Sequence, residues 1–224
     1  MALHRKMDAL LSLHPDIAII PECAAQADSP EGCSVWVGSI RFKGLAVLSF
    51  GDYRVALDES YDPSIQWAAP VRVTGPNDFF LLAIWGQRPY GQGVQTAIET
   101  YRSQLSAGPS VVAGDFNQNS AWDARNRPRN HTNTVEMLGE LGLISAYHHY
   151  FRRPQGRERH YTHYWRGQPE SEPGFHIDYC FLPEGWLEGP TKVKVGTYAK
   201  WIASGLSDHV PLVVEVEVPR AAGG

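Results

Sequence analysis

Polar side chains that are able to hold a metal ion or move a proton recur in this sequence beside apolar segments. They are Glu22, Asp115, Asn117, Asp178, Asp208 and His209. An unpaired carboxylate is costly to bury, so the repeated placement of carboxylates at the ends of apolar strands indicates that they have a functional role. Oxygen donors without cysteine favour a hard cation such as Mg²⁺ or Mn²⁺. Carboxylates, an amide and a histidine around such a cation fit the hydrolysis of phosphate esters.

Each of these residues also has a purely structural explanation. An Asp-His pair such as 208–209 often caps or bridges loops, and segment 114–117 could form an ordinary turn. Glu22 could lie on the surface after Pro21. The joint occurrence of the set in this order is more specific than any single member.

The elements that would position these residues are mostly short strands. Apolar runs and alternation predict strands at 16–20, 34–38, 45–50, 53–57, 69–74, 79–85, 110–114, 177–182 and 210–218. Apolar residues at helical spacing predict helices at 3–13, 92–106 and 134–141. Asn133 is expected to cap the last of these helices. Many strands with few helices between them indicate two packed sheets that are covered by helices on the outside.

Length and composition predict one globular domain. The chain has 224 residues, of which 43% are hydrophobic and 20% charged, enough for a core without disulfides or metal. No apolar run approaches the ~18 residues of a membrane-spanning helix, and we expect no secretory signal. Three cysteines without a CxxC pair suit a reducing cytoplasm. We therefore expect a cytoplasmic domain over 1–224, with 219–224 as a disordered tail.

The net charge of −4 argues against a protein that coats nucleic acid by bulk charge. The charge is unevenly distributed, because segment 125–159 contains seven arginines and three glutamates, a local excess of +4. This segment predicts a basic face for a polyanion. A solvated arginine-rich loop explains it equally well.

Four segments resemble motifs of the endonuclease/exonuclease/phosphatase superfamily, which includes deoxyribonuclease I, exonuclease III, AP endonucleases, sphingomyelinases and inositol-polyphosphate 5-phosphatases. Segment 15–22 is similar to the "PDI…QE" strand, 114–117 reads GDFN, 177–179 reads IDY, and 207–209 reads SDH. The resemblance covers nearly the whole chain. It implies an α/β fold, a four-layer α/β/β/α sandwich in which two packed, mainly antiparallel sheets are flanked by helices.

The resemblance implies a divalent-metal site. Glu22 would ligate Mg²⁺ or Mn²⁺, and Asp208 would ligate the same ion or a second one. In relatives, an asparagine ligand comes from a strand that precedes the helix matched here by 3–13. Only Met1 and Ala2 precede that helix. We therefore expect the natural reading frame to begin upstream, with Met1 as an internal methionine.

The resemblance also implies catalytic roles. Asp115 would orient or deprotonate the attacking water, and Asn117 would hold a phosphate oxygen. His209 would contact the scissile phosphate and transfer a proton, while Asp178 would hydrogen-bond to His209 and support its cationic form. Thr162 resembles a threonine that supports this active site in relatives.

The expected substrate contacts are less specific. Trp85 stands where relatives often carry a histidine or tyrosine, and an indole N–H donates a hydrogen bond but does not transfer a proton. Arg88 or Tyr90 would take over phosphate binding. The residues expected to line a substrate groove after GDFN are Asn119, Trp122, Arg125, Asn130 and His131.

The predicted function is that of a divalent-metal-dependent phosphodiesterase, a nuclease that hydrolyses DNA with metal-activated water and an Asp-His pair. One alternative is a phosphomonoesterase or phosphodiesterase that acts on small or lipid-headgroup phosphates, although no apolar hairpin for membrane insertion is evident. Another is a non-catalytic module that binds a phosphorylated ligand, which the absent first strand supports. DNA is the expected partner and no membrane is expected. The sequence indicates no oligomeric state.

Overall fold

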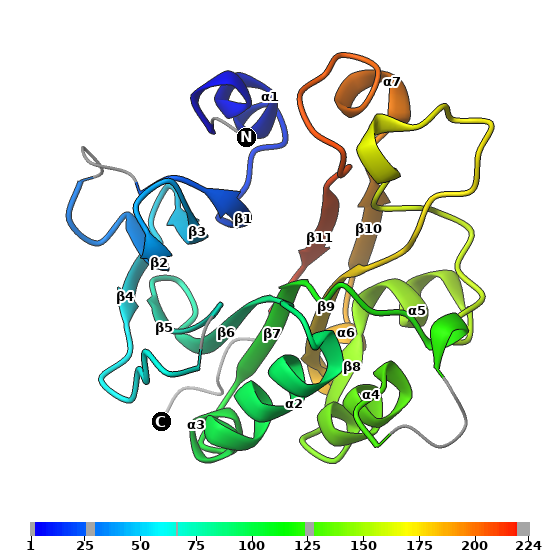
Figure 1. The fold of residues 1–224 in the computed structure, drawn as a ribbon. Coiled ribbons are helices and arrows are strands. Elements are labelled where there is room, and N and C mark those ends of the chain that lie inside the picture. Colours follow the sequence, from blue (N-terminus) through cyan, green and yellow to red (C-terminus); the bar gives the residue numbers. More distant parts are fainter. Residues whose placement is uncertain (1–2, 26–29, 66, 124–127, 219–224) are drawn as a thin grey trace.

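The computed structural model describes residues 3–25, 30–65, 67–123 and 128–218, and within these residues the strands form three hydrogen-bonded sheets (Figure 1). The six-stranded sheet has the order β4 (Arg54–Leu57), β5 (Ala68–Thr74), β6 (Phe79–Trp85), β7 (Ser110–Asp115), β9 (Asp178–Pro183) and β8 (Leu143–Ser145). The three-stranded sheet has the order β1 (Ile17–Cys23), β3 (Lys43–Ser49) and β2 (Ser34–Ile40). A two-stranded sheet pairs β10 (Thr191–Val195) with β11 (Leu212–Val216).

The six-stranded sheet is buried on both faces, which explains the continuous apolar run of β6. Leu81, Ala83 and Trp85 pack toward the smaller sheets, whereas Leu82 and Ile84 pack toward helices on the opposite side. Neighbouring strands are antiparallel except for β6 and β7, which are parallel. A parallel pair needs a crossover, and helices provide it here.

The helices occupy the outside of the sheets. The remaining elements are η1 (Leu3–Arg5), α1 (Met7–Leu11), α2 (Tyr90–Thr100), α3 (Arg102–Ser106), η2 (Ser120–Trp122), α4 (His131–Gly139), α5 (Ala146–Phe151), η3 (Trp165–Gly167), α6 (Glu184–Leu187) and α7 (Tyr198–Trp201). Val94 and Ile98 of α2 and Leu138 of α4 cover the six-stranded sheet. Leu3 and Met7 cover the outer face of the three-stranded sheet. The order of layers is therefore helix, sheet, sheet, helix, as predicted.

Several boundaries differ from the sequence-based expectation. The helix expected at 134–141 begins three residues earlier, because the side chain of Asn130 accepts a hydrogen bond from the backbone N–H of Asn133 at 2.9 Å and caps it. Asn133 is therefore not the cap. The helix expected at 92–106 is divided into α2 and α3 at Tyr101.

Short strands were harder to predict than long ones. Strands β8 and β10 are absent from the sequence-based expectation; β8 has only three residues, and the alternation in the five residues of β10 is short. The expected strand at 210–218 is shortened to β11. The expected tail at 219–224 lies outside the described residues. No helix in the described part of the chain is long and apolar enough to cross a membrane.

Candidate active site

Two aspartates lie side by side where β7 ends and β9 begins. The antiparallel register of these strands places Asp115 directly opposite Asp178. Asp115 is buried, with only 3% of the residue exposed. Burial, followed by the nearby negative charge of Asp178, raises the pKa of Asp115 to about 8. The pair therefore combines two carboxylates that resist being charged at the same time.

Asp178 also holds His209. The Nδ1 atom of His209 lies 2.9 Å from Oδ2 of Asp178, which confirms the hydrogen bond predicted from the sequence. Burial alone would lower the pKa of His209, but the charges of Asp178, Asp115 and Asp208 outweigh it and raise that pKa to about 10. At neutral pH His209 is therefore a cation whose Nδ1–H donates to Asp178.

The GDFN segment holds Asp115 from the other side. The backbone N–H of Asn117 donates to Oδ1 of Asp115 at 2.9 Å, and Nδ2 of Asn117 donates to Oδ2 of Asp115 at 2.8 Å. The same Nδ2 donates to the carbonyl oxygen of Gly86 at 3.0 Å. Both amide protons of Asn117 are thus used inside the protein. The amide of Asn117 therefore orients Asp115, and phosphate binding by Asn117, which also lines the cleft, remains a prediction.

Thr162 supports the start of β9. It is fully buried, and its Oγ1 accepts hydrogen bonds from the backbone N–H groups of Ile177 at 3.0 Å and Asp178 at 3.1 Å. Its carbonyl oxygen accepts from the backbone N–H of Val210 at 2.8 Å. One threonine therefore ties Asp178 to the segment that carries His209, as the resemblance implied.

Glu22 and Asp208 lie on the walls of a cleft of about 1420 Å³ that also contains Asp115, Asp178 and His209. Glu22 stands at an irregularity in β1 with a φ of 55°, and its side chain is 56% exposed. The side chain of Asp208 is 43% exposed. Two carboxylates on one cleft are suitable ligands for a hard cation. That both hold one ion remains a prediction.

Two lysines beside these carboxylates were missed by the sequence analysis. Lys43 Nζ lies 3.4 Å from Oε1 of Glu22 and 5.0 Å from the ring centroid of Trp85. Lys6 Nζ donates to Oγ of Ser207 at 3.3 Å. Burial lowers the pKa of Lys6, while Asp208 and Glu22 oppose that change. Lys6 is thus within electrostatic reach of both carboxylates. No motif marks either lysine.

His163 was also missed as a member of the site. Its ring centroid lies 4.5 Å from that of His209, and its Nε2 is 3.9 Å from Oδ2 of Asp208. Burial, together with the charge of His209, lowers the pKa of His163. His163 is therefore a neutral neighbour of the charged His209 at neutral pH.

Comparisons with known proteins are informative at the level of structure. No family model and no curated protein matches the sequence. The chain is similar to a 3′ phosphatase from Neisseria bound to a product DNA hairpin, with 18% identity and a TM-score of 0.70 over 96% of each chain. It is similar to an AP endonuclease from Archaeoglobus fulgidus, with 20% identity and a TM-score of 0.68 over 96% of this chain and 94% of that chain.

A third similar structure carries the superfamily name. It is an endonuclease/exonuclease/phosphatase from Beutenbergia cavernae, with 18% identity and a TM-score of 0.55 over 96% of this chain and 65% of that chain. This chain has the endonuclease/exonuclease/phosphatase fold. The architecture predicted from GDFN and SDH is thereby confirmed.

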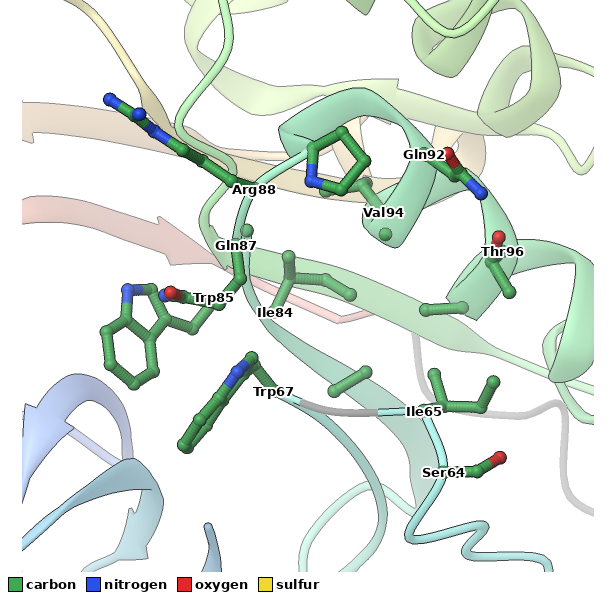
Figure 2. Close-up of a pocket in the computed structure, with 15 residues that line it drawn as sticks. Ser64, Ile65, Trp67, Ile84, Trp85, Gln87, Arg88, Gln92, Val94 and Thr96 are labelled. Carbon is green, nitrogen blue, oxygen red and sulfur yellow. The ribbon is translucent and has the colours of Figure 1, made fainter. Parts of the chain in front are cut away.

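In this endonuclease/exonuclease/phosphatase fold, Trp85 closes one side of the cleft. It is buried and packs edge-on against Trp67, with 4.8 Å between ring centroids. Arg88 Nε donates to the hydroxyl of Tyr90 at 3.3 Å, and Tyr90 lines the cleft. Figure 2 shows a smaller pocket of about 270 Å³ beside Trp67, Trp85 and Gln87, with the Arg88 side chain directed away from the two tryptophans. Phosphate binding by Arg88 and Tyr90 remains a prediction.

Asn119 does not line a groove, contrary to expectation. It is buried, and its Nδ2 lies 3.1 Å from Oε2 of Glu158, 3.0 Å from the carbonyl oxygen of His176 and 3.1 Å from the hydroxyl of Tyr179. Glu158 also pairs with Nε2 of His148 at 2.9 Å. Burial would raise the pKa of Glu158, but the His148 contact and the other hydrogen bonds hold it at about 2. Asn119 thus anchors the loop after GDFN.

Two other expected groove residues are structural as well. His131 is buried against the ring of Tyr179, and Asn130 is occupied as the cap of α4. Trp122 is 49% exposed and packs edge-on against Phe175, with 5.0 Å between ring centroids, so it remains available for contact with a substrate. Arg125 lies outside the described residues.

We expect His209 to keep its proton until about pH 10 in the metal-free protein, because Asp178 stabilises the cation. The Asp178→Asn variant removes that charge and should return the His209 pKa to its ordinary value of ~6.5 or lower. The ¹⁵N chemical shifts of the imidazole, followed from pH 5 to 11, measure both values. A wild-type midpoint near 6.5 would contradict the ion pair.

Proposed function

We propose that this protein is a divalent-metal-dependent phosphodiesterase that hydrolyses DNA. The observation that carries the proposal is the convergence of Asp115, Asp178 and His209 on the cleft whose walls also hold Glu22 and Asp208. The similar structures support it, since one is a 3′ phosphatase with a DNA product and another is an AP endonuclease.

The donor set fits a magnesium ion. Mg²⁺ is usually held by one or two carboxylates and fills its other positions with water and substrate phosphate. Glu22 and Asp208 would be the two carboxylates. Among the described residues, no group of three or more His, Cys, Asp and Glu side chains is placed to hold a metal. A bound cation would neutralise phosphate charge and lower the pKa of water.

The protein residues have distinct tasks in this proposal. Asp115 accepts the proton of the attacking water, and its pKa of about 8 is close to the range in which a general base is efficient. Asn117 fixes the direction of both Asp115 oxygens. His209, kept cationic by Asp178, donates to the phosphate and supplies a proton as the leaving oxygen departs.

The proposal is tested with a substrate panel at fixed salt, in Mg²⁺, in Mn²⁺ and with a chelator. The panel contains supercoiled plasmid, single-stranded DNA, a 3′-phosphorylated duplex, RNA and bis-nitrophenyl phosphate. Metal-dependent cleavage of a DNA phosphodiester that is lost in Asp115→Asn is expected. Release of phosphate from the 3′-phosphorylated duplex alone would favour the phosphomonoesterase, and DNA binding without turnover would favour the non-catalytic module. Either result would overturn the proposal.

The arginine-rich segment leads to a separate prediction about salt. Each phosphate contact contributes about 0.9 to the slope of log K against log salt concentration. We expect Arg125→Ala and Arg127→Ala to flatten that slope by about one unit. Arg129→Ala is the control, because Arg129 already pairs with Glu99 at 3.2 Å. Fluorescence anisotropy with labelled DNA between 50 and about 200 mM salt measures the slope. Identical slopes in all variants would remove the electrostatic support for a polyanion.

A further inference from the structure

We propose that this protein takes its DNA as an unpaired strand, whose bases stack on the exposed indoles of Trp122 and Trp165 near the proposed proton donor, His209. The inference rests on the proposed function, since it names the form of the DNA that the active site receives. Neither tryptophan is among the residues to which the proposed mechanism gives a task.

A continuous run of aromatic rings links the two tryptophans to His209. The ring centroid of Phe175 lies 5.0 Å from that of Trp122 and 6.1 Å from that of His163. The ring of His163 in turn lies 6.3 Å from Trp165 and 4.5 Å from His209. The two indoles are thus the outer members of a run that passes beside the proposed proton donor. Bases next to a phosphate held at His209 would therefore meet these rings.

Both indoles keep a flat surface open to solvent. About half of each residue is exposed, 49% of Trp122 and 56% of Trp165. Their neighbours in the run meet them at steep angles, because the ring of Phe175 is inclined by 69° to Trp122 and that of His163 by 79° to Trp165. A ring at such an angle does not lie flat over the indole. The exposed surface is therefore available for face-to-face stacking with a base.

An exposed arginine accompanies each indole. Arg166 follows Trp165, and its guanidinium carbon lies 5.4 Å from the centroid of that ring. Arg157 follows Gly156, whose backbone packs so closely on η2, the turn that carries Trp122, that an added Cβ would lie 3.1 Å from a backbone nitrogen of that turn. Aromatic rings beside cations are typical of surfaces that bind single strands, because the base meets the ring and the phosphate meets the charge.

The segment that carries Trp165 is tied to the segment that carries the proposed proton donor. The backbone N–H of Tyr164 donates to the carbonyl oxygen of Asp208 at 2.8 Å. The hydroxyl of Tyr198 donates to the carbonyl oxygen of Gln168 at 2.9 Å, and Figure 1 shows the yellow segment around η3 next to α7. The indole is thus held in place before a ligand arrives, which reduces the entropy lost on binding.

Stacking on these rings selects an unpaired strand. In a duplex the faces of each base are covered by its neighbours, so a protein contacts the base edges and the phosphates. A base reaches Trp122 or Trp165 face to face only after it has left the stack, and unstacking costs more free energy in a duplex than in a single strand. Duplex DNA should therefore bind more weakly than the same strand alone, although it carries more charge.

The test measures affinity for labelled oligonucleotides by fluorescence anisotropy, at fixed salt and with a chelator so that no turnover occurs. The probes are a mixed-sequence single strand, the same strand in a duplex, and an oligomer of abasic sites with the same length and charge as the single strand. We expect the wild type to bind the single strand about tenfold or more tightly than either other probe. Trp122→Ala and Trp165→Ala should each weaken binding of the single strand by about 5- to 100-fold and leave binding of the abasic oligomer unchanged.

The control variants separate stacking from other effects. Trp122→Phe and Trp165→Phe keep a ring and should recover most of the lost affinity. Phe42→Ala is the matched control, because Phe42 is 80% exposed on the turn between β2 and β3 and does not line the cleft. It should bind all probes like the wild type. Thermal unfolding checks that each variant is folded.

Three results would overturn the inference alone: equal affinity for the single strand and the abasic oligomer, a duplex bound as tightly as the single strand, or unchanged binding in both alanine variants. Each of them leaves metal-dependent cleavage of DNA to its own test, since no arm of this experiment depends on turnover. Binding to none of the probes would overturn the proposed function and this inference together.

Discussion

Replacing His209 with alanine should lower turnover of a DNA phosphodiester by about 10³- to 10⁴-fold while leaving the protein folded. The imidazolium is expected to act as the proton donor, and a positioned acid or base contributes about 10²- to 10⁴-fold to a rate. In the proposed mechanism the imidazolium also places a positive charge beside the phosphate, and losing that charge should add to the effect. Single-turnover kinetics with saturating Mg²⁺, together with thermal unfolding, measure the two effects separately.

The matched control for this variant is His149→Ala, since His149 is an exposed histidine on α5 that does not line the cleft. It should retain wild-type turnover. Asp178→Asn should also lose most of its activity, because the imidazole would remain in place without its supporting charge. A folded His209→Ala protein with turnover near that of the wild type would refute the role of the Asp178–His209 pair.

The second large effect is expected from Thr162→Val. Valine has the shape of threonine but no oxygen, so the buried N–H groups of Ile177 and Asp178 would lose their acceptor. Each unsatisfied buried donor costs about 1–3 kcal/mol, and we expect the free energy of unfolding to fall by about 2–4 kcal/mol. Turnover should fall as well, because Asp178 is no longer held. Urea unfolding and steady-state kinetics measure both changes.

The Thr162→Ser variant distinguishes the contribution of the hydroxyl group from that of the methyl group. It keeps the acceptor oxygen and should recover most of the turnover, although the lost methyl group costs some stability. The His209 pKa provides a readout that a purely structural role would not move. It should drop in Thr162→Val and stay near 10 in Thr162→Ser. Equal kinetics and equal pKa values in the two variants would show that Thr162 does not position Asp178.

The sequence could predict the residues of the site that lie in short motifs at strand ends. GDFN and IDY each place an aspartate at the end of a strand, and the antiparallel register of β7 and β9 then brings Asp115 and Asp178 together. The Asp178–His209 hydrogen bond could be inferred from the resemblance to the endonuclease/exonuclease/phosphatase superfamily, which pairs the histidine of SDH with the aspartate of IDY. These features depend on strand ends, which apolar runs and turns reveal.

The part that sequence could not predict depends on contacts between distant segments. Asn119 looks like a surface polar residue after a turn, but its partner Glu158 is 39 positions away along the chain. Lys6 and Lys43 reach the cleft only because α1 and β3 pack beside it. A lysine on an unremarkable segment carries no signal of such a position, since its long side chain is usually solvated.

The buried contacts of Asn119 with Glu158, and of Glu158 with His148, have a consequence for how new specificities could arise. These contacts hold the buried side of the loop after GDFN, while Trp122 on the same loop remains half exposed. The exposed surface of this loop, where we predict contact with a substrate, is thus separated from the contacts that hold the loop in place. Evolution, or a designed library, could therefore vary the exposed positions of this loop and sample new ligands while Asp115 and Asp178 stay in place. Substitution of Asn119 would instead disorder the loop, and would not simply change which ligand the loop prefers.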